Sequence, residues 1–482
     1  MPPPRPRVVG MSSQSGTADL VVVANRLPVR RVVEDDVVSW QTSPGGLVSA
    51  LRPSRAETDA LAWVGWAGDL DGDEDQLPPP EVDGIKLAAV PLSTRDKGLH
   101  YDGMSNGTLW PLYHDKVAPA AFHRSWYDGY RRVNENFAEV AAEMVREGGT
   151  VWVHDYQLQL VPELLRERRP DVTIGFFLHI PFPPEELFSQ LPWRKSLARG
   201  ILGSDLVGFQ TPDGVANFIR VCVARGIAER DGSNAVLTDD RRVRVGSFPI
   251  GIDYDRFEDA ARDHDVTNAS RDLRAQLGQP HVVLLGVDRL DYTKGIDVRL
   301  RAFKELLADG RLHASQVSMV QVAEPSRDDV DAYIELRARV EQLVGEINGD
   351  YGRVGFPVIH YIHQTQTFEE LLSMYRAADV MLVTPFRDGM NLVAKEYVAA
   401  RYDDTGTLVL SEFAGAAHHL QSALLVNPHD ITGVKNAIVA AVEMDPAEVR
   451  ERMVDMRKAV QETTASAWAE GFLAALADCT KA

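Results

Sequence analysis

Cysteine is scarce in this chain of 482 residues, which contains only Cys222 and Cys479. Two cysteines are too few for a disulfide framework and are typical of a protein with reduced thiols, so we expect a cytoplasmic location. The chain also lacks an apolar run of the ~18 residues that a membrane helix requires, which argues against a membrane partner. Met1–Gly10 contains four prolines where a signal peptide would carry an apolar stretch. We therefore expect no secretory signal.

Positive charge is the second shortage. The chain has 51 Lys and Arg against 70 Asp and Glu, which gives a formal net charge of −19. A nucleic-acid backbone is held mainly by Lys and Arg, so this balance argues against nucleic-acid binding. It does not exclude small anionic substrates, because these respond to local charge. Hydrophobic residues at 45% and charged residues at 25% are typical of a folded globular protein and exclude disorder over most of the chain.

Short apolar runs rich in β-branched residues alternate with stretches of helical period. Several runs are apolar throughout, which is typical of parallel strands buried on both faces. Phe368–Ala377 has the apolar spacing of a helix. The pattern predicts an α/β protein with doubly wound parallel sheets. The expected strands are Leu20–Ala24, Thr150–Val153, Thr173–Leu178, Asp205–Phe209, His281–Val287, Val317–Val322, Val358–Ile362, Val380–Thr384 and Thr407–Leu410.

The chain is too long for one hydrophobic core, which stops growing near ~250–300 residues. Breakers in Phe248–Asp253 separate two sets of strand–helix units, so we place a domain boundary there. We expect two Rossmann-like halves, residues 19–249 and 250–460, that face a cleft where ligands bind. Residues 1–18 are expected to be a flexible leader, and residues 461–482 a helix that packs back on the first half.

A pair of cations follows one predicted strand. Arg289 and Lys294 lie in Asp288–Gly295, between the strand that ends near Val287 and a helix start. Cations next to free N–H groups suit a diphosphate, whose charge must be neutralised as it leaves. The alternative is a solvated loop in which Asp288 and Asp291 neutralise these cations. The local sequence leaves both interpretations open.

A second loop, Thr384–Glu396, follows the strand Val380–Thr384 and opens a helix. Gly389 permits close backbone approach, and the N–H groups of Met390, Asn391 and Leu392 are expected to point out of the helix start. Asp388 and Glu396 are eight residues apart, which predicts that Glu396 lies two turns deeper along the same side. A carboxylate there suits ribose hydroxyls.

Two further segments end predicted strands in the first half. His154-Asp155 and His179 occupy such ends, where a single histidine is more often structural than catalytic unless its position favours function. Arg26 follows the first strand and precedes Gly45-Gly46, which is a weak signal for nucleotide binding. The histidines lack the spacing of metal ligands, so we expect no metal site and no cofactor.

The acidic segment Asp69–Asp75 offers a competing interpretation. It resembles the D-x-D-G start of phosphatases that use the first Asp as a nucleophile with magnesium. However, five carboxylates lie within these seven residues and would repel a phosphate. A solvated acidic loop is therefore favoured.

Taken together, these blocks resemble the trehalose-6-phosphate synthases, a family of retaining glycosyltransferases with the GT-B fold of two Rossmann-like domains. The similarity runs from Val21–Arg26 to Leu425–Pro428 and is most specific in Phe177–Pro183, Arg289–Gly295 and Arg387–Val393. The resemblance implies transfer of glucose, with retention, from UDP- or ADP-glucose to glucose 6-phosphate, giving trehalose 6-phosphate and the nucleoside diphosphate. It also implies a homo-tetramer and leaves the donor base open.

The resemblance also implies roles for individual residues. The residues implied to bind the donor are Gly46, Arg289, Lys294, Asp388, Met390, Asn391, Leu392 and Glu396. Those implied to bind the acceptor are Arg26, Tyr101, Trp110, Asp155 and Arg327. The implied catalytic residues are Arg289, Lys294, His179 and Asp155, without a metal.

Two alternatives stay open within the same fold. One is a related glycosyltransferase with another phosphorylated acceptor such as glycerol 3-phosphate, against which Arg26 and Arg327 argue. The other is a regulatory homologue without catalysis, against which the intact Arg289, Lys294 and Glu396 argue.

Overall fold

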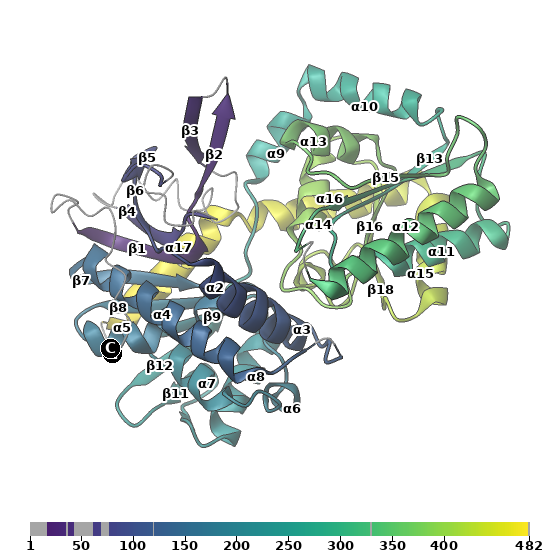
Figure 1. Cartoon of the computed structure of the whole chain (residues 1–482). Coiled ribbons are helices and arrows are strands. Elements are labelled where there is room, and N and C mark those ends of the chain that lie inside the picture. The colour runs from purple at the N-terminus through teal and green to yellow at the C-terminus, as the bar shows by residue number, and fades with distance from the viewer. Residues whose placement is uncertain are drawn as a thin grey trace. The chain divides into compact units, whose positions relative to one another are not determined.

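The apolar runs of the sequence form two separate sheets in the computed structural model, which describes residues 17–34, 37–42, 61–68, 77–118, 120–327 and 330–480 (Figure 1). Each sheet is the centre of one unit. Unit 1 is Met1–Pro249 together with Ala465–Ala482, and unit 2 is Ile250–Thr464. Most of the expected leader, Gly46 and the acidic segment Asp69–Asp75 lie outside the described residues. The cleft expected between the halves stays a prediction.

Unit 1 is built on a sheet with the order β10-β11-β12-β9-β8-β7-β1-β4-β6-β5. The strands from β12 to β6 in this order run parallel, and β5, β10 and β11 add antiparallel edges. A separate antiparallel hairpin is formed by β2 and β3. The strands are β1 (Ala18–Arg26), β2 (Val29–Glu34), β3 (Val37–Thr42), β4 (Leu61–Trp66), β5 (Glu81–Val82), β6 (Ile85–Ala89), β7 (Val145–His154), β8 (Thr173–Leu178), β9 (Leu206–Phe209), β10 (Glu229–Arg230), β11 (Ala235–Leu237) and β12 (Arg242–Ser247).

The helices of unit 1 connect and cover these strands. They are α2 (Thr94–Asp96), the π-helix η3 (Lys97–Leu109), α3 (Trp110–Tyr113), α4 (Arg124–Met144), η4 (Tyr156–Leu158), α5 (Val161–Arg168), α6 (Glu185–Phe188), α7 (Arg194–Leu202), α8 (Pro212–Ala224), α17 (Ala465–Ala477) and η6 (Asp478–Thr480). Local sequence sets their ends: α8 begins at Pro212 after Thr211, whose side chain accepts a hydrogen bond from the Gly214 N–H. Proline at the first helical position and threonine before it are the residues that such a start favours.

The last α-helix of the described residues, α17, packs on the sheet of unit 1 (Figure 1). A Cβ atom added to Gly175 on β8 would lie 2.7 Å from the Phe472 ring, so glycine is needed for this close approach. The Phe472 ring also stacks on Trp152 of β7, with centroids 4.6 Å apart. The C-terminal segment is therefore part of the hydrophobic core of unit 1.

Unit 2 has a six-stranded parallel sheet with the order β15-β14-β13-β16-β17-β18. The strands are β13 (Val282–Arg289), β14 (Val317–Glu324), β15 (Ile359–Ile362), β16 (Val380–Val383), β17 (Thr407–Ser411) and β18 (Leu424–Val426). The helices are α9 (Tyr254–Ala261), α10 (His264–Gln276), α11 (Ile296–Ala308), α12 (Asp331–Tyr351), α13 (Phe368–Ala377), α14 (Leu392–Ala400), η5 (Gly415–His418), α15 (Ile431–Glu443) and α16 (Pro446–Glu462).

The predicted fold class is confirmed, and each expected strand coincides with an observed one to within a few residues. Helix α13 has the predicted bounds, and a capping box between Thr367 and Glu370 fixes its start. The hairpin β2–β3 and the strands β4, β5, β6, β10, β11, β12 and β18 were not among the expected strands. Among the described residues, no helix combines the length and the apolar character needed to cross a bilayer.

Candidate active site

Both sheets have the Rossmann strand order. In each sheet, the order in which successive strands are added reverses at one point, the switch point. Numbered within its unit, the sheet of unit 2 runs 3-2-1-4-5-6, with the reversal between β13 and β16. The strands β6-β4-β1-β7-β8-β9 of unit 1 follow the same order, with the reversal between β1 and β7. Ligands of such sheets bind outside the carboxyl ends of the strands at this point. Arg26 and Asp155 lie at the ends of the switch-point strands of unit 1, and Arg289, Lys294 and Asp388 lie at or after the ends of those of unit 2.

In unit 1, two histidines pair at the ends of β7 and β8. His154 Nδ1 lies 3.1 Å from His179 Nε2, a distance at which one ring donates a hydrogen bond to the other. Burial lowers the pKa of His179 to about 4 and the pKa of His154 well below its usual value, with His179 adding to the shift at His154. Both rings are therefore neutral near pH 7 and suit sugar hydroxyls better than phosphate.

Asp155 is fixed next to this pair by a rare backbone conformation. Its φ of 74° lies in a region that non-glycine residues seldom adopt. The Asp155 N–H donates to the Phe177 carbonyl at 2.7 Å, and Asp155 Oδ1 accepts from the His179 N–H at 3.3 Å. Strain of this kind concentrates at functional sites and persists only where the surroundings hold it.

The predicted acceptor residues of unit 1 form two aromatic groups. The Arg26 guanidinium lies 4.0 Å from the centroid of the Trp66 ring, and Tyr101 packs against the same ring at 6.2 Å. Tyr101 belongs to η3. π-Helical turns are rare in proteins as a whole, but those that occur are often found at functional sites. Trp110 packs against Tyr156, the residue after Asp155, with centroids 5.6 Å apart. Trp66 ends an apolar run, but no motif in the sequence marks it as a site residue.

In unit 2, the two predicted phosphate loops are joined by an ion pair. Lys294 Nζ donates to Asp388 Oδ2 at 2.5 Å, and both side chains are largely buried. Gly295 permits this approach of the loops, since a Cβ atom there would lie 2.2 Å from the Thr384 carbonyl oxygen and its φ is 63°. Arg289 is the last residue of β13 and its side chain is exposed.

The charges of these loops pair differently from the alternative in the sequence analysis. Asp288 pairs with the buried Arg299 at 2.7 Å, and Asp291 faces Arg327. Neither of them is the acid that pairs with Lys294. A diphosphate that approaches this loop therefore meets a Lys294 whose direct ion-pair partner is Asp388, from the other loop.

The helix that carries Glu396, the predicted ribose-binding residue, begins later than the spacing of Asp388 and Glu396 suggested. Asn391 caps α14 with a φ of 73°, and its side chain accepts from the Ala394 N–H. Its amide also donates to Asp388 Oδ2 at 3.1 Å. Because Asp388 precedes the cap, the prediction that Asp388 and Glu396 lie two turns apart on one helix is wrong. The left-handed cap at Asn391 turns the chain before the helix starts.

Glu396 lies within α14 and is half-buried. Tyr375 donates to its Oε2 atom at 3.0 Å. Burial raises the pKa of Glu396 to about 7, and the nearby Glu324 contributes in the same direction. A carboxyl group that is partly protonated near neutral pH can both accept from and donate to a ribose hydroxyl. Tyr375 is a second site residue that no motif in the sequence marks.

The structure therefore gathers the predicted residues into two sets. Unit 1 holds Arg26, Tyr101, Trp110, Asp155 and His179, whereas unit 2 holds Arg289, Arg327, Lys294, Asp388, Met390, Asn391, Leu392 and Glu396. Among the described residues, no group of three or more His, Cys, Asp or Glu side chains is arranged to hold a metal ion.

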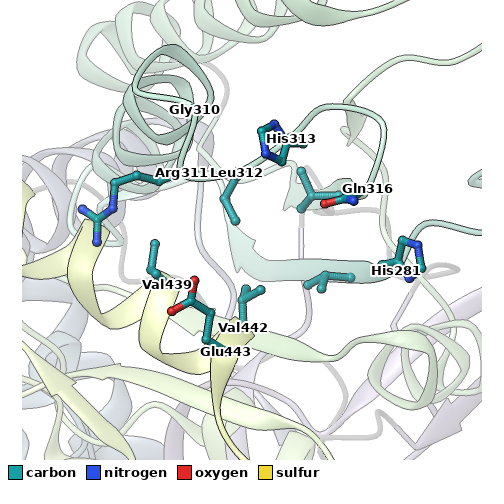
Figure 2. A pocket seen from close by; sticks show the side chains of 11 residues that line it. His281, Gly310, Arg311, Leu312, His313, Gln316, Val439, Val442 and Glu443 are labelled. Carbon is teal, nitrogen blue, oxygen red and sulfur yellow. The ribbon is translucent and has the colours of Figure 1, made fainter.

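Two surface cavities lie away from these sets. A cavity of about 560 Å³ in unit 2 is lined by His281, His313 and Glu443, which come from the segments before β13 and β14 and from α15 (Figure 2). Another, of about 660 Å³, in unit 1 includes Pro170 and Gly203, which precede β8 and β9. Both lie near the amino ends of the strands, opposite the ends where Rossmann-like sheets bind ligands.

Comparison with known proteins assigns the chain to a family. The model of glycosyltransferase family 20 matches residues 18–478. The trehalose-6-phosphate synthase of Mycobacterium marinum is 52% identical over 473 residues, which cover 96% of this chain and 94% of that protein.

Solved structures of trehalose-phosphate synthases are also similar to this chain. A UDP-forming α,α-trehalose-phosphate synthase from Burkholderia xenovorans, in complex with glucose 6-phosphate, is 35% identical with a TM-score of 0.85 and covers 95% of this chain and 99% of its own. An E. coli structure with UDP-2-fluoro glucose has the same identity and TM-score, with coverage of 95% and 98%. The resemblance found in the sequence is confirmed, together with the GT-B fold class: the chain belongs to glycosyltransferase family 20.

Proposed function

We propose that this protein transfers glucose from UDP-glucose to glucose 6-phosphate and so forms trehalose 6-phosphate and UDP. The observation that carries the proposal is the position of Arg289 and Lys294 at the switch point of unit 2, next to the loop of Asp388. Cations there neutralise the charge that develops on a leaving diphosphate. The ligands of the Burkholderia and E. coli relatives support the same pair of substrates.

The other predicted site residues are assigned to the acceptor or to the sugars of the donor. Arg26 and Arg327 suit the 6-phosphate, because a guanidinium binds phosphate oxygens through paired N–H donors. Asp155 suits an acceptor hydroxyl, and the neutral His179 suits the donor glucose. Glu396 is assigned to the ribose of the donor.

The proposed reaction retains the configuration at the transferred carbon. The bond between the donor C1 and the diphosphate oxygen breaks while the acceptor hydroxyl oxygen bonds to C1 from the same face. The hydroxyl proton passes to the departing diphosphate, which Arg289 and Lys294 stabilise. This route needs no pair of carboxylates ~5–5.5 Å apart of the kind that retaining glycosidases use. Positioning and electrostatic stabilisation supply the catalysis.

One assay tests the proposal. The protein is incubated with UDP-, ADP- or GDP-glucose and glucose 6-phosphate, without added metal, and products are followed by NMR. We expect α,α-linked trehalose 6-phosphate and free UDP from UDP-glucose. The rates with the three donors rank them, and we expect ADP-glucose to come second. Release of inorganic phosphate alone would contradict the proposal. If the protein transferred glucose to glycerol 3-phosphate, supplied as a competing acceptor, faster than to glucose 6-phosphate, the acceptor would be reassigned.

Two broader features are also proposals. A homo-tetramer rests on the family resemblance and is tested by light scattering of the purified protein. A cytoplasmic location is supported by the free thiols of Cys222 and Cys479. Fractionation of cells that produce the protein tests it.

A further inference from the structure

Asp291 stands out among the acidic groups of unit 2 because its two oxygens serve different parts of the site. It lies between β13 and α11 and is fully buried. The proposed function gives it no role. Burial works to raise its pKa, but the positive charges of Arg327, Arg289 and Lys294 outweigh that effect and lower the pKa overall. Asp291 is therefore a buried carboxylate that stays ionised.

One oxygen of Asp291 fixes the loop that carries the donor cations. Oδ1 accepts from the Thr293 N–H at 2.9 Å and from Thr293 Oγ1 at 2.8 Å. The Asp291 carbonyl accepts from the Lys294 N–H at 3.0 Å. Arg289 and Lys294 flank these contacts, so the backbone between them is held by the carboxylate and the carbonyl of a single aspartate.

The other oxygen faces the arginine that is assigned to the acceptor phosphate. Oδ2 lies 3.5 Å from Arg327 Nη1 and accepts from the Tyr333 hydroxyl at 3.1 Å. Tyr333 also contacts Arg327 Nη1 directly, and its ring packs against Tyr292. The Arg327 side chain is 6% exposed, and its backbone has a φ of 54°. A strained backbone and a largely buried guanidinium require partners that hold them.

We propose that Asp291 is a positioning residue that orients Arg327 for the acceptor phosphate and ties it to the loop that holds the donor diphosphate. The inference rests on the proposed function and deepens it. Because one carboxylate holds both elements, the two anion-binding groups of unit 2 keep a fixed geometry before either substrate binds. Preorganisation of this kind lowers the cost of binding.

The test is a double-mutant cycle measured by steady-state kinetics with UDP-glucose and glucose 6-phosphate. Asp291→Asn keeps the shape of the side chain but replaces the negative charge that faces Arg327 with a neutral amide group. We expect its KM for glucose 6-phosphate to rise about 10-fold or more, as for loss of a hydrogen bond to a charged group. The KM for UDP-glucose should change less than ~3-fold, because Thr293 can still donate to the amide oxygen.

The decisive variant combines Asp291→Asn with Arg327→Ala. If Asp291 acts on the acceptor through Arg327, the double variant has the same KM for glucose 6-phosphate as Arg327→Ala alone, within ~2-fold. Additive effects of the two substitutions would overturn the inference. So would an equal rise in the KM of both substrates, since general loosening of the loop would produce it.

Two further variants keep the test decisive if Asp291→Asn fails to fold. Tyr333→Phe leaves the carboxylate in place, and we expect a rise of about 3-fold in the KM for glucose 6-phosphate that disappears in the Arg327→Ala background; a rise that persists there would overturn the inference. Asp379→Asn is the matched control, since Asp379 pairs with Arg274 at 2.9 Å and accepts from the Val283 N–H at 2.7 Å near the amino end of β13. Both its KM values should stay unchanged. A wild-type protein that makes no trehalose 6-phosphate would instead contradict the proposed function.

Discussion

The two units share a strand order but place different chemistry at the carboxyl ends of their strands. In unit 1, the neutral pair His154–His179 and the rings of Trp66 and Trp110 accompany only two of the predicted charged residues, Arg26 and Asp155. Unit 2 presents ions that are already paired, Lys294 with Asp388 among them. The fold fixes where a ligand binds, and the side chains decide which part of a substrate each unit suits.

This difference has a physical basis. Neutral imidazoles and indoles can be buried at little electrostatic cost, so unit 1 can enclose a sugar in an apolar surround. Charged groups in unit 2 need partners while they wait for a diphosphate, and carboxylates supply them. Substitutions in the two units should therefore fail in different ways.

The largest effect is expected in unit 2, from Lys294→Ala. Loss of this cation removes stabilisation of the leaving diphosphate and leaves Asp388 without its ammonium partner. We expect kcat to fall about 10³-fold, with a much smaller change in the KM for glucose 6-phosphate. Steady-state assays check this, with Lys304→Ala as the control, since Lys304 pairs with the exposed Glu346. An unchanged kcat would remove Lys294 from the proposed catalytic residues.

In unit 1, the next largest effect is structural and follows from Trp468→Ala. The Trp468 ring is buried and lies 5.0 Å from both Trp152 and Phe177, measured between centroids. Its removal leaves a cavity, and we expect a loss of about 3 kcal/mol in the stability of unit 1. Hydrogen exchange should become faster in β7 and β8 but not in β13 and β16. Trp468→Phe is the control, and equal loss of protection in both units would contradict the division of the core.

A smaller effect is expected from Arg26→Ala, which tests whether unit 1 also binds an anion. The substitution removes a guanidinium that stacks on Trp66. We expect the KM for glucose 6-phosphate to rise about 10- to 30-fold, while kcat and the KM for UDP-glucose change little. Arg26→Lys should recover only part of the affinity, because it lacks the paired donors. A rise in the KM of UDP-glucose instead would assign Arg26 to the donor.

The smallest effect concerns pH and Glu396→Gln in unit 2. Since folding raises the pKa of Glu396 from 4.5 to about 7, the unfolded chain releases this proton at a lower pH than the folded protein does. Stability from this group is therefore present below pH 4.5 and is lost as the pH rises through 7. Relative to the wild type, Glu396→Gln should gain about 1 kcal/mol between pH 4.5 and 8. Thermal unfolding across this range measures it, and a difference that does not depend on pH would contradict the raised pKa.

The sequence predicts the fold well because buried parallel strands leave uninterrupted apolar runs. Those runs place Arg289, Asp155 and Asp388 after strands, which suffices to nominate them. The partners of these residues come from distant segments: Tyr375 meets Glu396 across 21 positions, and Tyr333 meets Asp291 across 42. No local pattern records such pairs. The short edge strands β10 and β11 were missed because two or three residues carry no period.

The insertion of unit 2 between the two segments of unit 1 has a consequence for biosynthesis. Unit 2 is complete when residue 464 has been made, whereas unit 1 waits for Ala465–Ala477. Trp468 and Phe472 pack on the strands that carry His154 and His179, so these strands have no such cover on a nascent chain. Unit 1 therefore cannot complete its core before unit 2 has been translated, unlike the usual case in which an N-terminal domain is finished first. The strands that are translated first receive the aromatic cover of their histidine pair last.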